Sequence, residues 1–146
     1  MTQLNFRYIT RAIILSNDCL LLCKQKQGNY TFLPGGHIEL GESATQALKR
    51  EINEEIGEIV SIKNFSGAIE NAWEDECEIS LFFEVNHQLT VGKVPKPASQ
   101  DEMHLEFLWA DKNCLEKQNL LPKPLIKILK EPLDIPFWNS TINPER

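Results

Sequence analysis

The chain has 146 residues, a length that fits one domain burying about two-thirds of the surface of its unfolded chain. Apolar residues make up 42% and charged residues 25%, as in an ordinary globular protein, and no apolar run is long enough to span a bilayer. The net charge of −6 argues against a basic nucleic-acid-binding face. We therefore expect one cytoplasmic domain over residues 1–146, with neither nucleic acid nor a membrane as partner.

Two strands joined by a tight turn are predicted near the start, at residues 8–15 and 20–24, because Asn17-Asp18 between them is typical of a hairpin. Arg11 on the first strand is a candidate to contact phosphate oxygens, although we favour a solvated strand edge. Residues 31–33 are expected to be extended because Pro34 disfavours helical backbone before it. The Gly35-Gly36 pair that follows indicates a loop.

A helix is predicted to begin at about Ala44. Ser43 can cap its first turn, and Gln46 occupies the capping-box position from which a side chain reaches back to the cap. Gly57 marks its end, because glycine adopts the left-handed conformation that closes helices. The helix is therefore about three to four turns long.

Three glutamates share one side of this helix. The apolar stripe consists of Ala44, Leu48, Ile52 and Ile56. Glu55 falls within the stripe, Glu51 lies on its edge and Glu54 a little further round, whereas Arg50 turns outward. Carboxylates at this spacing repel one another by roughly 4 kcal/mol per pair at 4 Å and an effective dielectric near 20. A counter-charge is needed.

The counter-charge is best supplied by a metal ion. A solvated acidic face would lie opposite the apolar stripe, whereas these acids border it, beside the Gly35-Gly36 loop. Lys49 and Arg50 are too few to pair with all three acids. Oxygen ligands without a nearby Cys or His favour a hard divalent cation, which predicts Mg²⁺ or Mn²⁺.

The second half of the chain supplies further strands and loops. Residues 60–69 and 79–85 are predicted strands, the second from its clean alternation, with a polar, acid-rich connection at 70–78. Trp73 in that connection can stack on a base or cover the edge of the core. Residues 87–100 are expected to form a long loop that faces the substrate, ending at Asp101-Glu102 before a strand at 105–109.

The C-terminal part is predicted to hold one helix and an extension. Residues 120–130 repeat apolar side chains at helical spacing, although Pro122 and Pro124 confine the regular helix to the later turns. From about residue 132 the chain is punctuated by proline yet too apolar for a free tail. It either folds back on its own domain or docks on a second subunit, so a homodimer is one of the two alternatives.

The glycine loop and the acidic helix together resemble the signature of the Nudix hydrolases. Pro34-Gly35-Gly36 is followed after five residues by Glu42 and after seven more by residues 50–57, Arg-Glu-Ile-Asn-Glu-Glu-Ile-Gly. One position departs, because Glu58 replaces the aliphatic residue that closes the signature. The resemblance covers roughly residues 8–130 and implies an α/β fold, the Nudix α/β/α sandwich, with a mixed sheet between helices.

The resemblance also implies an activity and its residues. Nudix hydrolases use a metal to direct water onto the diphosphate linkage of a nucleoside diphosphate joined to another group. The implied metal ligands are the backbone carbonyl of Gly35 and the side chains of Glu51, Glu54 and Glu55. The implied catalytic residues are Glu51, Glu54, Arg50, which would orient Glu51, and a loop acid, Glu102 or alternatively Glu106, that takes the proton of water. The substrate-binding candidates are Arg11, Gly36 and Trp73.

Two alternatives remain at this point. A Nudix fold can be kept as a nucleotide sensor without turnover, although such a module has no reason to retain three mutually repelling acids. The isomerase branch of the family acts on isoprenoid diphosphates, but its members are longer and need additional residues that this chain does not show. The particular nucleoside diphosphate derivative is not predicted.

Overall fold

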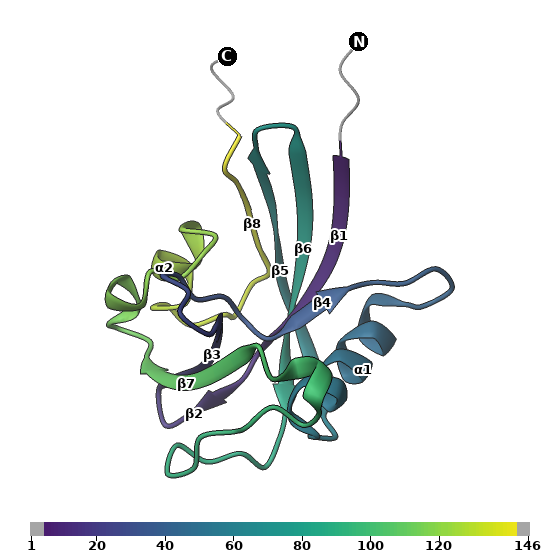
Figure 1. The fold of residues 1–146 in the computed structure, drawn as a ribbon. Helices are drawn as coiled ribbons and strands as arrows, with labels where there is room; N and C mark the ends of the chain where they lie inside the picture. The colour runs from purple at the N-terminus through teal and green to yellow at the C-terminus, as the bar shows by residue number, and fades with distance from the viewer. Residues whose placement is uncertain (1–4, 143–146) are drawn as a thin grey trace.

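A five-stranded mixed sheet forms the centre of the molecule (Figure 1). A computed structural model describes residues 5–142. The sheet order is β4-β1-β6-β5-β8, with β1 parallel to β6 and β5 parallel to β8, and with antiparallel pairing at β4–β1 and β5–β6. The strands are β1 (Asn5–Ile13), β4 (Gly35–His37), β5 (Ser61–Trp73), β6 (Glu76–Asn86) and β8 (Phe137–Ser140).

A smaller antiparallel sheet completes the strand structure. It orders β2 (Leu15–Ser16), β3 (Cys19–Gln25) and β7 (Leu105–Asp111). Asn17 and Asp18 both have positive φ, 50° and 64°, as a tight turn between twisted strands requires. The predicted hairpin is therefore confirmed.

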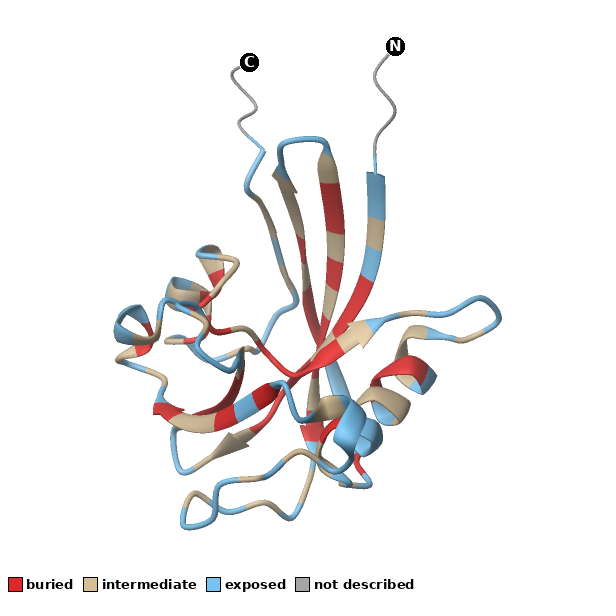
Figure 2. Cartoon of the chain, viewed as in Figure 1, coloured by how far each residue is buried: buried red, intermediate tan, exposed pale blue. Residues whose placement is uncertain are grey.

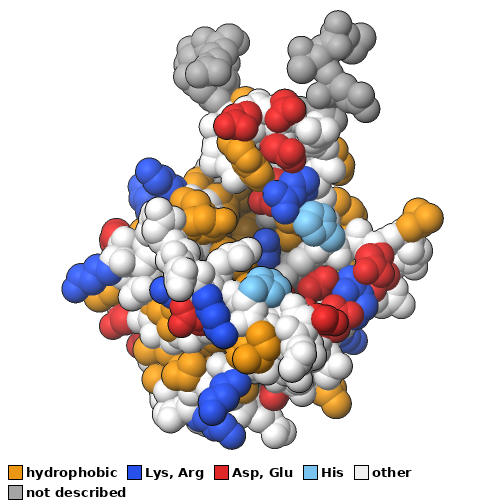
Figure 3. All heavy atoms as spheres, viewed as in Figure 1, with side chains coloured by type: hydrophobic (Ala, Val, Ile, Leu, Met, Phe, Trp, Pro, Cys, Tyr) orange, Lys and Arg blue, Asp and Glu red, His pale blue; other side chains and the backbone are white. Residues whose placement is uncertain are grey.

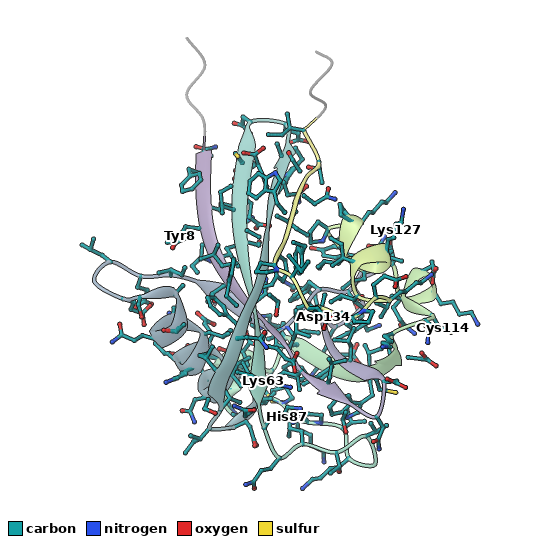
Figure 4. All side chains as sticks on the ribbon, turned by 180° about the vertical axis from the view of Figure 1, so that it is seen from behind. Tyr8, Lys63, His87, Cys114, Lys127 and Asp134 are labelled. Atoms are coloured by element: carbon teal, nitrogen blue, oxygen red, sulfur yellow. The ribbon has the colours of Figure 1, made fainter. Side chains whose placement is uncertain are left out.

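Helices flank the large sheet on both sides. Helix α1 (Ala44–Ile56) lies on one side and α2 (Pro124–Ile128) on the other, with short 3₁₀ segments η1 (Gln100–Glu102) and η2 (Leu115–Gln118) (Figure 1). From behind, Tyr8 of β1 and Lys127 of α2 lie to either side of the β5–β6 hairpin (Figure 4). This arrangement confirms the expected mixed sheet between helices. No helix within residues 5–142 is both long and apolar enough to cross a bilayer.

Helix α1 begins and ends where the sequence predicts. The backbone amide of Gln46 donates to Ser43 Oγ at 3.1 Å, and the amide of Ser43 donates to Gln46 Oε1 at 2.9 Å, which is the capping box. Gly57 takes the left-handed conformation with φ 71°. Buried Leu48 and Ile52 join the core beneath this helix, while a second core lies under α2 (Figure 2).

The predicted polar connection at residues 70–78 is wrong. Residues 70–73 continue β5 and residues 76–78 begin β6, so only Glu74 and Asp75 form the turn of a long hairpin. Two polar residues of this stretch, Asn71 and Glu78, line a pocket. From the sequence alone, polar residues at such strand positions are interpreted as a loop. Residues 35–37 were also expected as loop and instead form β4.

The C-terminal extension folds back on its own chain. Strand β8 pairs in parallel with β5, with Gly67 opposite Phe137. A Cβ atom at Gly67 would lie 2.5 Å from Phe137 Cδ1, so only glycine permits this approach. The Phe137 ring also packs on Phe82, with 5.6 Å between centroids. Residues 143–146 of the predicted extension lie outside the described part. The regular helix predicted within 120–130 is confined to α2, which follows Pro122 and begins at Pro124.

Candidate metal and substrate site

A pocket of about 950 Å³ opens on one face of the large sheet. Its walls come from β1, β4, the β5–β6 hairpin, the region around η1 and the segment before α2. The charged and aromatic side chains among its lining residues are Arg7, Arg11, Tyr30, Phe32, His37, Glu55, Trp73, Glu78, Phe82, Glu102, His104 and Lys123. Figure 3 shows this face, with basic, acidic and histidine side chains gathered around its centre. The volume is that of a small-molecule site.

The glycine pair brings the α1 acids against the loop. A Cβ atom at Gly36 would lie 2.5 Å from the carboxyl carbon of Glu51, so the Glu51 carboxylate occupies the space that a side chain would need. The Gly35 amide donates to Glu55 Oε1 at 3.4 Å. Gly35 also has φ 143°, which L side chains rarely adopt. Close approach and backbone conformation thus explain the two glycines.

Glu55 is a buried carboxylate with an unused oxygen. It is 5% exposed, and within residues 5–142 its Oε2 has no hydrogen-bond partner. Burial raises the pKa of Glu55 to about 8, while the nearby Arg11 opposes the shift and Glu51 adds to it. Burial also raises the pKa of Glu51, opposed by Arg50. Both carboxylates would be stabilised by a cation placed between them and the loop.

Arg50 connects the acids to the loop. Its Nε donates to Glu42 Oε2 at 2.7 Å, and its Nη1 donates to Glu51 Oε1 at 3.0 Å and to Glu54 Oε2 at 3.2 Å. Its Nη2 donates to the backbone oxygen of His37 at 3.1 Å. The outward orientation predicted from the helical wheel is therefore wrong, because the long side chain bends back over the acids. The hydrogen bond to Arg50 lowers the pKa of Glu42 to about 2.

Arg11 lies inside the sheet. Strand β1 runs between β4 and β6, so the interpretation of Arg11 as a solvated strand edge is wrong. Its Nη1 donates to the backbone oxygen of Leu33 at 3.0 Å, and its guanidinium carbon lies 5.4 Å from the centroid of the Phe32 ring. Burial lowers the pKa of Arg11 from its usual value, opposed by Glu78 and Glu55. This guanidinium lines the pocket, where phosphate oxygens can reach it.

The structure separates the two candidate loop acids. Glu102 lines the pocket, and its charge contributes to the raised pKa of both Glu51 and Glu55. Glu106 lies outside the pocket and forms an ion pair with Lys24 at 3.7 Å. The geometry therefore favours Glu102.

Trp73 and two histidines also border the pocket. Trp73 is 39% exposed at the end of β5, with the Arg7 guanidinium 5.9 Å from its ring centroid. His37 lies exposed at the end of β4 and accepts a hydrogen bond from Arg7 Nε at 3.4 Å. Partial desolvation of its imidazole and, second, the positive charge of Arg7 lower the pKa of His37. His104 is exposed and also lines the pocket.

From the sequence alone we did not identify the polar residues at the end of the pocket formed by the tip of the β5–β6 hairpin, which we call the hairpin end. Arg7, Asn71, Glu78 and Thr141 line this end but belong to four separate parts of the chain. The only available signal was that Arg7 precedes Arg11 by four residues on one strand and so shares its face.

The three α1 acids do not converge on one point in this structure. In the part of the chain that the structure describes, no three His, Cys, Asp or Glu side chains are arranged to hold a metal ion. Glu54 is exposed and engaged by Arg50, and of the three α1 acids only Glu55 lines the pocket. The donor set is nevertheless one of hard oxygens, and the unpartnered Glu55 Oε2 is an atom that a cation would satisfy. The residues fit a divalent ion if Glu54 releases Arg50.

The chain matches the family model of the NUDIX domain over residues 6–129. The nucleoside triphosphatase NudI of Salmonella arizonae is 42% identical over 57 residues. That alignment covers 36% of this chain and 40% of the Salmonella protein, so it spans less than half of the relative.

Several solved structures share the fold. A MutT protein from Methanosarcina mazei superposes with a TM-score of 0.73 at 17% identity, covering 89% of this chain and 96% of that one. A UDP-X diphosphatase superposes with a TM-score of 0.71 at 16% identity, covering 95% of this chain and 69% of that one. The ORF135 protein of E. coli superposes with a TM-score of 0.67 at 21% identity, covering 85% of this chain and 88% of that one.

Proposed function

Because the chain belongs to the Nudix hydrolase family, we propose that it hydrolyses the diphosphate linkage of a nucleoside diphosphate derivative, such as a nucleotide sugar, ADP-ribose or a nucleoside triphosphate. We place this activity in the cytoplasm and assign it Mg²⁺, or Mn²⁺ in its place. The observation that carries the proposal is the buried Glu55 carboxylate beside Glu51, with an oxygen that lacks a protein partner at the edge of a nucleotide-sized pocket.

Four residues would hold the cation. These are Glu51, Glu55, Glu54 after it leaves Arg50, and Gly35 through its backbone carbonyl. A bound divalent cation neutralises diphosphate charge and lowers the pKa of a coordinated water.

The protein's own groups supply positioning and proton transfer. Arg50 holds Glu51 by a hydrogen bond of 3.0 Å and ties it through Glu42 to the loop. Arg11 presents a guanidinium to phosphate oxygens in the pocket. Glu102 or Glu51 accepts the proton of the attacking water. Such positioning of charged groups is the main requirement of phosphoryl chemistry.

The test is a substrate panel with and without metal. ADP-ribose, nucleotide sugars, dinucleoside polyphosphates and nucleoside triphosphates are incubated with the protein and Mg²⁺, and products are separated by anion-exchange chromatography. We expect cleavage of at least one compound at a diphosphate linkage, abolished by EDTA. No cleavage of any compound, in Mg²⁺ or Mn²⁺, would overturn the proposal and favour the sensor. Conversion of isopentenyl diphosphate would favour the isomerase.

A further inference from the structure

A row of four polar side chains crosses the sheet at the hairpin end of the pocket. Arg7 of β1 is paired in register with Glu78 of β6, and Glu78 is paired with Asn71 of β5. Thr141, just after β8, donates from its hydroxyl to Asn71 Oδ1 at 2.7 Å. All four residues line the pocket. Arg7 lies four residues along β1 from Arg11, a distance of about 13 Å, and Arg11 is close enough to Glu55 for its charge to oppose the shift in the pKa of Glu55. The row therefore lies toward the end of the pocket away from Glu55, on the part of β1 and the β5–β6 hairpin that extends away from α1 in Figure 1.

Glu78 presents under-used acceptors to the pocket. It is 9% exposed, and Arg7 Nε is 4.0 Å from its Oε1. Within residues 5–142 its Oε2 accepts only a long hydrogen bond, of 3.4 Å, from Ser80 Oγ. A buried carboxylate requires several donors, because its desolvation is costly and its two oxygens can accept about four hydrogen bonds. The side chain therefore has two neighbouring oxygens available for a ligand with N–H groups.

Thr141 fixes the orientation of the Asn71 amide. The backbone amide of Ala72 donates to Thr141 Oγ1 at 3.0 Å, so the hydroxyl hydrogen is free to be donated to Asn71 Oδ1. The amide oxygen is thereby engaged, and the Nδ2 group is the end left to donate. Among residues 5–142 this Nδ2 has no protein acceptor. The row thus offers two acceptors beside a donor.

We propose that this row selects guanine as the base of the substrate, an inference that rests on the proposed function. Guanine is the common base whose pairing edge carries two adjacent donors, N1–H and the N2 amino group, beside the O6 acceptor. The two oxygens of Glu78 accept from N1–H and N2–H, and Asn71 Nδ2 donates to O6. Adenine, cytosine and uracil place acceptors beside a single donor group and would face the carboxylate with a lone pair. Trp73, in the same pocket, supplies a stacking surface.

Thr141 is a positioning residue in this proposal. It follows β8 and lies outside residues 6–129, the stretch matched by the family model. The extension therefore adds a specificity element to the domain, because Thr141 leaves only the donor end of Asn71 facing the base.

The test compares the binding of GMP and AMP by calorimetry in EDTA, where no turnover occurs. We expect wild-type protein to prefer GMP by about tenfold or more, because two hydrogen bonds to a charged group discriminate the bases. Glu78→Gln should reduce the preference to within about twofold, because the amide keeps one acceptor and gains a donor. Glu76→Gln, on the same strand but outside the pocket lining, is the matched control and should keep the preference.

A second pair of variants tests the positioning role. Thr141→Val should weaken GMP binding by about fivefold, the worth of about one hydrogen bond, while Thr141→Ser, which keeps the hydroxyl, should bind as wild type does. The ratio of GMP to AMP affinity is measured on one sample, so partial loss of folded protein does not alter it.

Equal or unmeasurable binding of the two nucleotides by wild type, or an unchanged preference in Glu78→Gln, would overturn the inference. Hydrolysis of nucleotides without base preference would overturn the inference alone. Selective GMP binding without hydrolysis of any substrate would overturn only the proposed function.

Discussion

The two ends of the pocket are built in different ways. The acid end takes Gly35, Gly36, Glu51 and Glu55 from one short stretch of chain, and the caps of α1 fix their arrangement. The hairpin end assembles residues from four strands or their ends, and only strand register brings them together. The proposed chemistry is thus encoded locally, whereas the proposed selectivity is encoded by long-range pairing. Changes at the two ends should therefore affect different kinetic parameters.

The largest effect is expected from Glu54→Gln at the acid end. Loss of one metal ligand should lower kcat by about a thousandfold, corresponding to roughly 4 kcal/mol of transition-state stabilisation. The fold should persist because Glu54 is exposed and the amide oxygen of the glutamine can still accept the hydrogen bond from Arg50. Steady-state kinetics and circular dichroism measure the two outcomes. Glu58→Gln, four residues further along and outside the helix, is the control. An unchanged kcat in Glu54→Gln would show that this acid is not a ligand.

Glu55 should make the stability of the metal-free protein depend on pH. Its pKa is about 8 in the folded state against an ordinary 4.5, so the folded state retains a proton that the unfolded chain releases between these values. Stability should therefore fall as pH rises from about 4.5 to 8, by on the order of 4 kcal/mol from this group.

Urea unfolding in EDTA at pH 5 and pH 8.5 measures this dependence. Glu55→Gln should remove most of it and leave the variant more stable than wild type at the higher pH. If wild type and variant lose stability in parallel, the buried carboxylate is not the group responsible.

Gly36→Ala tests the contact between loop and helix. The new methyl group would lie 2.5 Å from the carboxyl carbon of Glu51, closer than van der Waals contact allows. We therefore expect the free energy of unfolding to fall by about 2 kcal/mol and kcat to fall as well. Gly92→Ala is the matched control, because no atom of the described residues lies within 4 Å of a Cβ atom there. Thermal unfolding and kinetics on both variants decide the point. Equal behaviour of the two would mean that Glu51 does not need the space beside Gly36.

The smallest effect is expected at the hairpin end. Trp73→Ala should raise KM by about tenfold through loss of stacking and leave kcat unchanged, because the reacting groups lie at the other end of the pocket. Trp73→Phe should keep most of the affinity. A large fall in kcat with constant KM would contradict the division of the pocket into two ends.

The difference between the ends also explains what the sequence could predict. The start and end of α1, and the place of Glu55 on its apolar side, follow from Ser43, Gln46 and Gly57 and from helical periodicity. The burial of Arg11 does not, because it depends on β4 and β6 pairing on either side of β1.

The hairpin shows the same limit. Polar residues that line a pocket remove the apolar alternation by which strands are recognised, so residues 70–78 resembled a loop. The role of Thr141 depends on β8, whose pairing with β5 is decided by the absence of a side chain at Gly67.

The central claim is that the α1 glutamates hold a divalent cation beside the glycine loop. Titration of Mn²⁺ followed by electron paramagnetic resonance tests it directly, because bound ion loses the signal of free Mn²⁺. We expect wild-type protein to bind Mn²⁺ and Glu51→Gln/Glu55→Gln to lose that binding while remaining folded. Failure of wild type to bind Mn²⁺, with or without nucleotide, or equal binding by the double variant, would contradict the account.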